Sequence, residues 1–167
     1  MTRRLRLAGL AFVAAVVAVL TLQVGSAQAS VGGYGPIINS AGRGCVDVRT
    51  EDGANNFGAH IQNYHCTGSA EQQWMEQPVG NGFYHIVSKR SGLCLDGGGF
   101  WAVQWGCGNV PQQNWQQVWQ AGFPSNAVQL RNGSGQCLEL TAGNGADHQQ
   151  LSVTTCASWY AQWWEIH

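Results

Sequence analysis

Carboxylates, amides and aromatic rings stand at fixed distances from cysteines in this chain. Asp47 follows Cys45 by two residues, and Tyr64 precedes Cys66 by two residues, with Gln62 two residues further upstream. An ionised carboxylate accepts strong charge-assisted hydrogen bonds from hydroxyl groups, and an amide both donates and accepts. A flat aromatic ring packs against an apolar face. If a fold gathers these side chains in one pocket, they can hold a molecule that presents several hydroxyl groups and one apolar face.

The same arrangement occurs twice more along the chain. In the second copy Asp96 and Trp105 hold the carboxylate and ring positions, and in the third copy Glu139 and Thr154 hold them. Self-similarity of this kind indicates a repeat architecture. Every copy closes on the sequence Gln-x-Trp, at residues 72–74, 113–115 and 162–164. We expect three copies, at about residues 35–77, 83–119 and 127–167.

Short strands separated by glycine- and asparagine-rich turns must position these residues. The segments predicted to pair as hairpins are 37–38 with 45–46, 83–87 with 93–95, and 127–130 with 137–140. Single helical turns are expected before each Gln-x-Trp, and no sustained helical period follows residue 30. We therefore expect an all-β protein with four strands in each copy. A propeller is an alternative, but propellers usually have about four to eight blades, so a closed barrel with pseudo-threefold symmetry fits better.

The six cysteines divide evenly among the three copies. In an exported chain they are typical of a disulfide framework, and pairing within each copy predicts Cys45–Cys66, Cys94–Cys107 and Cys137–Cys156. Each bridge would stabilise the fold by about 3 kcal/mol on a loop-entropy estimate. A zinc site is the alternative, but the chain contains no Cys-x-x-Cys pair.

Residues 1–29 have the pattern of a signal peptide. Three arginines precede an apolar run at residues 7–22, and residues 27–29 offer a small-residue cleavage site. A membrane anchor is the alternative, but this run is shorter than the roughly 20 residues that a membrane-spanning helix needs. We expect a secreted, extracellular protein whose single mature domain spans residues 30–167, with no membrane segment after cleavage.

The mature domain is acidic. Only five of the eight Lys and Arg residues fall within residues 30–167, against all nine Asp and Glu residues. Nucleic-acid binding depends on neutralising phosphates with basic side chains, so we expect no nucleic-acid partner. The five histidines are scattered, and His60 and His65 point to opposite sides of an extended stretch. We therefore expect no metal and no other cofactor.

The motif Cys-[Val/Leu]-Asp, the ring before the second cysteine and Gln-x-Trp, in three tandem copies, resemble the ricin-B-type lectins, also called carbohydrate-binding module family 13. The resemblance covers roughly residues 35–167. It implies a β-trefoil fold with shallow, weak pockets for carbohydrate, either a galactose-type sugar or a plant or microbial polysaccharide. We expect the Gln-x-Trp tryptophans in the core, since a buried indole removes about 150–250 Å² from water. They are Trp74, Trp115 and Trp164.

The resemblance implies a carbohydrate-binding role for nine residues. They are Asp47, Gln62, Tyr64, Glu71 and Gln72 in the first copy, and Asp96, Trp105, Gln112 and Gln113 in the second. Glu71 departs from the family, which often has Asn before Gln-x-Trp, and a carboxylate lacks the amide donors. Gln112 keeps an amide at that position. Val103 replaces the polar contact made by Gln62, and Gln104 is a candidate to compensate for it.

The third copy departs most from the family pattern. Glu139 replaces the aspartate, Thr154 the ring, Ser152 the polar contact and Ala161 the asparagine. Because this copy has no ring for stacking and carries a longer acid, we expect no binding there.

Other readings stay open at this point. Asp47 and Asp96 can be turn residues that satisfy backbone donors, and Tyr64 and Trp105 can be half-buried strand residues. A glycosidase needs two acids about 5–9.5 Å apart in one cleft. Each copy offers essentially one acid, with Asp47 and Glu71 the pair to check, so we expect a non-enzymatic protein, and a monomer. The main alternative is a protein-binding β-trefoil, such as a protease inhibitor or toxin subunit, acting through an exposed loop.

Overall fold

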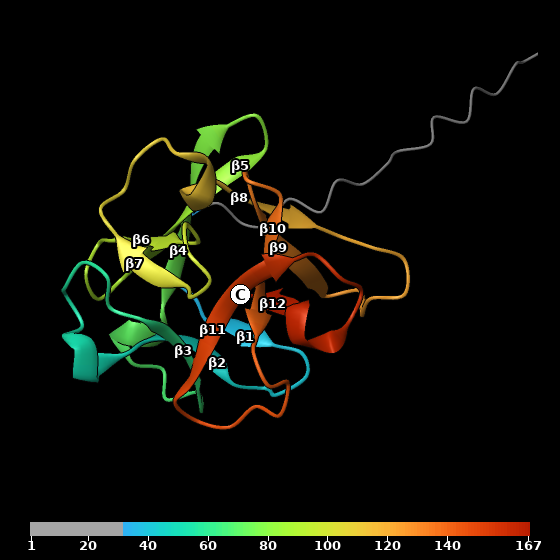
Figure 1. The fold of residues 1–167 in the computed structure, drawn as a ribbon, viewed down its shortest axis with the longest axis horizontal. Coiled ribbons are helices and arrows are strands. Elements are labelled where there is room, and N and C mark those ends of the chain that lie inside the picture. The colour runs from blue at the N-terminus through green and yellow to red at the C-terminus, as the bar shows by residue number, and fades with distance from the viewer. Residues whose placement is uncertain (1–31) are drawn as a thin grey trace, which may run out of the picture.

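The computed structural model describes residues 32–167, and the signal peptide expected at residues 1–29 lies outside them. Twelve short strands build the domain in three successive sets of four (Figure 1). The first set is β1 (Ile37–Asn39), β2 (Cys45–Val48), β3 (Ile61–Tyr64) and β4 (Trp74–Gly80). The second set is β5 (Phe83–Ser88), β6 (Cys94–Asp96), β7 (Val103–Trp105) and β8 (Trp115–Val118). The third set is β9 (Ala127–Asn132), β10 (Gln136–Leu140), β11 (Gln149–Thr155) and β12 (Trp164–Ile166).

The first and last strands of the three sets close into a barrel. Antiparallel ladders join β1 to β12, β12 to β9, β9 to β8, β8 to β5 and β5 to β4. A bridge between Gly35 and Trp74 returns from β4 to the residues before β1. A closed barrel leaves no edge strand of its own unpaired. The predicted all-β fold with a closed barrel is confirmed, and the propeller alternative is excluded.

The middle strands of each set form a hairpin over one end of the barrel. These hairpins are β2–β3, β6–β7 and β10–β11. They also touch one another, because Gln149 pairs with Asn63, His60 with Val103, and Trp101 with Ser152. A residue on one hairpin can therefore lie beside a pocket that belongs to another repeat.

The three Gln-x-Trp tryptophans lie in the core. Each indole Nε1 donates a hydrogen bond to the carbonyl oxygen of the residue that follows the first cysteine of its repeat, which satisfies the one polar atom that the buried ring carries. The pairs are Trp74–Val46 at 2.8 Å, Trp115–Leu95 at 2.9 Å and Trp164–Leu138 at 3.0 Å. Leu95, Leu138 and Leu140 are among the apolar side chains that fill the remaining space.

The three disulfides form within the repeats, as Cys45–Cys66, Cys94–Cys107 and Cys137–Cys156. Single 3₁₀ turns precede the tryptophans, as the sequence predicts: η2 (Ala70–Gln72), η3 (Pro111–Gln113) and η4 (Tyr160–Gln162). A further turn, η1 (Thr50–Asp52), follows β2.

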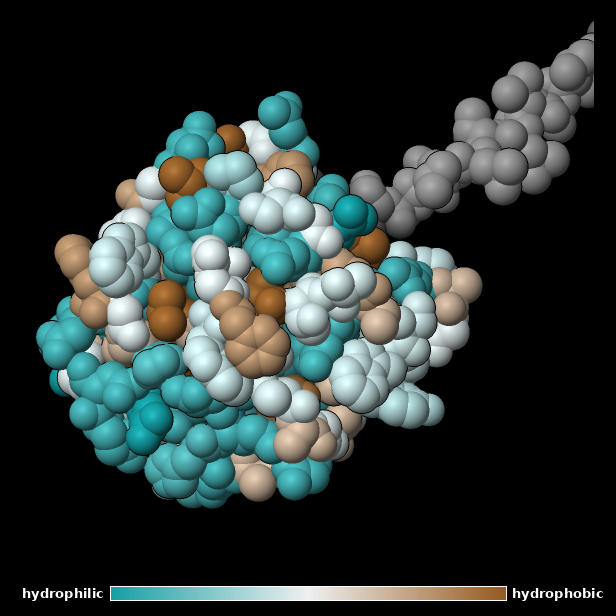
Figure 2. Space-filling model, in the orientation of Figure 1, coloured by the Kyte–Doolittle hydropathy of each residue, from teal (hydrophilic) through white to brown (hydrophobic). Residues whose placement is uncertain are grey.

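The surface of the described residues is mixed. On the face shown in Figure 2, hydrophobic residues form small separate patches among hydrophilic ones. A large contiguous apolar patch would mark a protein-binding face, and this view of the described residues shows none. No helix within residues 32–167 combines the length and the apolar composition that crossing a membrane requires.

Candidate carbohydrate-binding site

Strand register places each pocket carboxylate opposite a residue of the neighbouring strand. Asp47 on β2 faces Gln62 on β3, and Asp96 on β6 faces Val103 on β7. Directly opposite residues lie on the same face of a hairpin. The carboxylate position therefore meets an amide in the first repeat and an apolar side chain in the second. In the third repeat, Glu139 on β10 faces Ser152 on β11.

The glutamine of each Gln-x-Trp ties the pocket together. Its side-chain oxygen accepts a 2.7 Å hydrogen bond from a backbone N–H just after the second cysteine, at Thr67, Gly108 and Ala157 respectively. The side-chain nitrogen of Gln113 donates to Oδ2 of Asp96 at 2.8 Å. The amide therefore fixes the loop and orients the carboxylate together.

In the first repeat the carboxylate is oriented differently. Gln62 Nε2 donates to Oδ1 of Asp47 at 2.8 Å, whereas Gln72 Nε2 donates to the carbonyl of His65 at 2.9 Å. Asp47 and Gln62 are both nearly buried. Oε1 of Gln62 has no hydrogen-bond partner in the protein and is itself buried.

The first pocket is a hollow of about 180 Å³. Of the five residues predicted for it, Asp47, Gln62, Tyr64 and Glu71 line it, while Gln72 lies behind and fixes the loop. The sequence prediction missed five further lining residues: Thr50, Glu51, Thr67, Ser69 and His148.

His148 comes from the third repeat. It lies in the turn before β11, and its imidazole meets the ring of Tyr64 edge-on, with centroids 4.9 Å apart. The preceding residue, Asp147, accepts hydrogen bonds from the backbone N–H of His65 at 2.7 Å and pairs with its Nδ1 at 2.8 Å. This contact lowers the pKa of Asp147 and fastens the third-repeat loop to the wall of the first pocket. The spacing of residues within one repeat does not predict a contact between two repeats.

The carboxyl of Asp47 is harder to ionise than an ordinary aspartate. Burial raises its pKa, and the negative charges of Glu71 and Glu51 raise it further, while the hydrogen bond from Gln62 lowers it in part. Desolvation disfavours the charged form of an acid, whereas donors stabilise it.

Glu71 is held by a partner outside the family pattern. Its carboxylate lies 3.3 Å from Nε of Arg90, which comes from the β5–β6 turn of the second repeat. Asp47 and Glu71 both line the first pocket, but this ion pair draws Glu71 toward Arg90. The lost asparagine amide is thus replaced by a carboxylate–guanidinium pair at the pocket rim.

The second pocket is wider, at about 380 Å³. All four predicted residues, Asp96, Trp105, Gln112 and Gln113, line it. Asp96 is held at both oxygens, because Oδ1 accepts from the backbone N–H of Gly98 at 2.7 Å and Oδ2 accepts from Gln113. Trp105 exposes about half of its surface, at 48%.

Gln104 does not compensate for Val103, and that expectation is wrong. Its side chain is fully buried on the opposite face of β7, where Nε2 donates to the carbonyls of Ala54 and Asn56 at 3.0 and 2.9 Å. Alternation along a strand sends neighbouring side chains to opposite faces, and no register shift intervenes between Asp96 and Val103.

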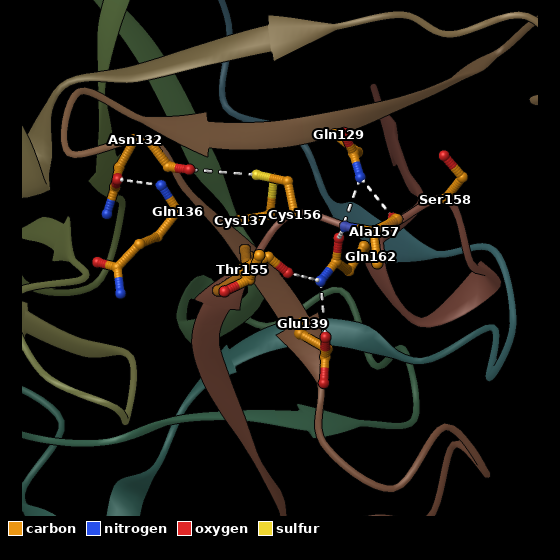
Figure 3. The surroundings of a disulfide bond; sticks show 12 residues. Gln129, Asn132, Gln136, Cys137, Glu139, Thr155, Cys156, Ala157, Ser158 and Gln162 are labelled. Carbon is orange, nitrogen blue, oxygen red and sulfur yellow. Dashed lines mark hydrogen bonds between the residues drawn. A yellow bond between two sulfur atoms is a disulfide. The ribbon is translucent and has the colours of Figure 1, made fainter.

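In the third repeat one oxygen of the carboxylate accepts two hydrogen bonds from the same repeat. Gln162 Nε2 donates to Oε2 of Glu139 at 2.7 Å and to the carbonyl of Thr155 at 3.0 Å, beside the Cys137–Cys156 disulfide (Figure 3). Trp159 Nε1 donates to the same Glu139 oxygen at 3.2 Å. Trp159 stands three residues after the second cysteine, where the other repeats have Ser69 and Val110.

A cavity of about 560 Å³ lies at the third repeat, but Glu139 does not line it. Its wall is made by small residues and two aromatic ones: Ser40, Ala41, Ala142, Gly143, Trp159, Tyr160 and Ala161. Thr154 faces Cys137 across the hairpin and offers no ring.

One group of side chains has the composition of a metal site. Ligand atoms of His85, Cys94 and Cys107 lie within 4.8 Å of one another. Both cysteines belong to one disulfide, so neither offers the thiolate that binds a metal ion.

Comparison with protein families identifies the domain type that this geometry resembles. A model of the ricin-type β-trefoil lectin domain matches residues 33–164. No curated protein matches the chain by sequence.

Solved structures show the same fold. The designed threefold-symmetric protein ThreeFoil superposes with a TM-score of 0.72 at 22% identity, over 81% of this chain and 98% of that one. The Macrolepiota procera ricin B-like lectin, solved in complex with lactose, gives 0.69 at 20% identity, over 83% and 96%. An exo-β-1,3-galactanase from Clostridium thermocellum gives 0.71 at 22% identity, over 80% of this chain and only 30% of that enzyme.

Proposed function

The chain belongs to the ricin-type β-trefoil lectin domain family, and we propose that it binds carbohydrate in its first and second pockets. The observation that carries this proposal is the paired geometry of carboxylate and ring. Asp47 and Tyr64 line one hollow, and Asp96 and Trp105 line another. Each hollow thus joins a hydrogen-bond acceptor to a stacking surface.

In the first pocket the carboxylate of Asp47 accepts hydrogen bonds from two neighbouring hydroxyls of a sugar. The Gln62 amide fixes the carboxylate. The apolar C–H face of the pyranose packs on Tyr64. Glu71 and Arg90 at the rim supply an acceptor and donors where the family has an amide.

In the second pocket Asp96 is pre-oriented by Gly98 and Gln113, and Trp105 supplies the ring. Pre-orientation lowers the entropy lost on binding. Gln112 lines the pocket and offers an amide to the remaining hydroxyls. We propose no sugar at Glu139, because it does not line the cavity at the third repeat and that repeat has Thr154 where the others have a ring.

The favoured ligand is a galactose-type sugar, either free or within a polysaccharide. Lactose in the Macrolepiota procera complex and the galactan substrate of the galactanase support this class. A millimolar dissociation constant corresponds to only about −4 kcal/mol, and shallow open pockets suit such weak binding. Two pockets on one rigid body raise the avidity for a polymer by about 10² to 10⁴ when their spacing matches.

The protein acts outside the cell in this proposal. Three disulfides and the signal-like pattern of residues 1–29 support export. We assign no catalytic residue, since Glu71 and Glu51 lie in ion pairs with Arg90 and Arg49, and Asp47 and Asp96 serve as acceptors for sugar hydroxyls. A protein-binding trefoil, the alternative, would not require carboxylate and ring to share a pocket.

A glycan array probed with the mature domain, residues 30–167, tests this proposal. We expect signals concentrated on galactose-containing glycans. An array without any bound glycan would refute carbohydrate binding and favour the protein-binding alternative.

A further inference from the structure

Phe57 and Trp105 form one exposed aromatic surface across the boundary between the first and second repeats. Their ring centroids lie 5.5 Å apart, and their planes are tilted by 36°. Phe57 is 62% exposed and Trp105 is 48% exposed. Trp105 belongs to the second pocket, whereas Phe57 lies on the loop between η1 and β3. We call these two rings the aromatic ledge.

Glycines flank both rings of the ledge, with ordinary van der Waals room beside them. A Cβ atom at Gly58 would lie 3.4 Å from the ring of Trp105, and one at Gly106 would lie 3.7 Å from the ring of Phe57. Gly58 also has a φ of +81°, which L side chains rarely adopt. Any longer side chain at either position would occupy space next to the ledge.

The loop that carries Phe57 is fastened to β7. Gly58 N donates to the carbonyl of Gln104 at 2.8 Å, and Gln104 N donates to the carbonyl of Ala59 at 2.9 Å. The buried Gln104 side chain adds its two hydrogen bonds to the carbonyls of Ala54 and Asn56. Phe57 is thus held next to Trp105 before any ligand arrives, so ordering this loop adds little to the entropy lost on binding.

The first pocket has different surroundings. The rings next to Tyr64 are the imidazoles of His65 and His148, at 4.3 and 4.9 Å. Carboxylates lie beside both imidazoles, with Asp147 2.8 Å from His65 and Glu51 3.8 Å from His148. That surface is polar and charged, and the hollow is less than half as large as the second one.

We propose that the aromatic ledge extends the second pocket into a site for two consecutive pyranose units of a glycan chain, whereas the first pocket takes a single unit. This inference rests on the proposed function. Asp96 is the one acidic residue that lines the second pocket, and it holds the hydroxyls of the unit that stacks on Trp105. The next unit packs its C–H face on Phe57. The tilt between the two rings fits a chain whose successive units are rotated relative to one another.

The experiment isolates the second pocket in an Asp47→Ala background. Galactose, xylose and arabinose, and the linear trisaccharide of each, are titrated by calorimetry into three proteins. These are Asp47→Ala alone, Asp47→Ala with Phe57→Ala, and Asp47→Ala with Trp119→Ala. Trp119 is the matched control, because it is 59% exposed and does not line the second pocket.

We expect the trisaccharide of the preferred sugar to bind more tightly than its monosaccharide. Phe57→Ala should lower the trisaccharide affinity about threefold to tenfold and leave the monosaccharide affinity unchanged. Phe57→Tyr, which keeps a ring, should restore the trisaccharide affinity, and Trp119→Ala should change neither value.

Equal affinities for monosaccharide and trisaccharide would overturn the inference. So would a Phe57→Ala protein that loses both affinities alike, or neither. If the unmutated protein binds none of the six sugars, or if Asp47→Ala with Asp96→Ala still binds them, the proposed function itself fails and the inference fails with it.

Discussion

The indole nitrogen of Trp159 lies 3.2 Å from Oε2 of Glu139, the same oxygen that Gln162 holds at 2.7 Å. The third repeat therefore directs two donors of its own onto one oxygen of this carboxylate, and Glu139 does not line the cavity at that repeat. These contacts turn the Glu139 carboxylate toward Gln162 and Trp159. The third repeat thus has the disulfide and the core tryptophan of the other two repeats, but its carboxylate does not line that cavity.

Glu139→Gln should leave glycan binding unchanged and reduce stability. An amide at this position keeps one acceptor oxygen for Gln162 and Trp159 but loses the negative charge that strengthens both hydrogen bonds, which should lower the free energy of unfolding by about 1–2 kcal/mol. Denaturant unfolding and calorimetry with the preferred glycan measure the two effects. The matched variant Asp47→Asn should reduce binding at the first pocket. A loss of binding in Glu139→Gln would show that the third repeat takes part.

Affinity at the first pocket should fall as the pH is lowered. The pH at which it falls should be higher than for a pocket whose aspartate has an ordinary pKa. Folding raises the pKa of Asp47, so the carboxylate takes up a proton above its usual value of about 3.9. The neutral acid accepts hydrogen bonds less strongly than the carboxylate. Affinity measured against pH in an Asp96→Ala background should therefore stay level near neutrality and fall as pH drops through the raised pKa.

Glu71→Gln provides the control for this pH dependence. It removes a negative charge that raises the pKa of Asp47 and leaves Arg90 unpaired nearby, so the midpoint should move to lower pH. A midpoint that stays in place would show that Glu71 does not act on Asp47.

Trp115→Phe should destabilise the domain without touching the pockets. Phenylalanine keeps a ring but loses the Nε1 donor, which leaves the buried Leu95 carbonyl without its 2.9 Å partner. The expected loss is about 1–3 kcal/mol in the free energy of unfolding. Trp119→Phe, at an exposed position, should change stability by no more than about 0.5 kcal/mol. Equal effects of the two variants in denaturant unfolding would contradict the assigned role of the core tryptophans.

Features that lie within one repeat could be predicted from the sequence. Cys45 and Cys66 sit at corresponding places in a unit that occurs three times, so their pairing follows from the repeat. The burial of Trp115 and its two equivalents could be predicted in the same way, because a large apolar residue that occurs at the same position in all three copies is expected to fill the shared core. The lining positions of Asp47, Tyr64, Asp96 and Trp105 could be predicted for the same reason.

Contacts between repeats could not be predicted in this way. His148 reaches Tyr64, Arg90 reaches Glu71 and Phe57 reaches Trp105, in each case from a loop of another repeat. Repeat spacing aligns equivalent positions but does not reveal which loops meet when the three hairpins pack together. The prediction that Gln104 lines the second pocket is wrong for a related reason. Its side chain is bound by the carbonyls of Ala54 and Asn56, on a loop of the first repeat.

The most direct test of the central claim is glycan binding by the double variant Asp47→Ala with Asp96→Ala, measured on the glycan that the unmutated domain prefers. Both side chains are buried and hydrogen-bonded, so far-ultraviolet circular dichroism is used to establish that the double variant is folded. We predict that each single variant keeps part of the binding and that the double variant loses it. Undiminished binding by a folded double variant would contradict the assignment of these two pockets.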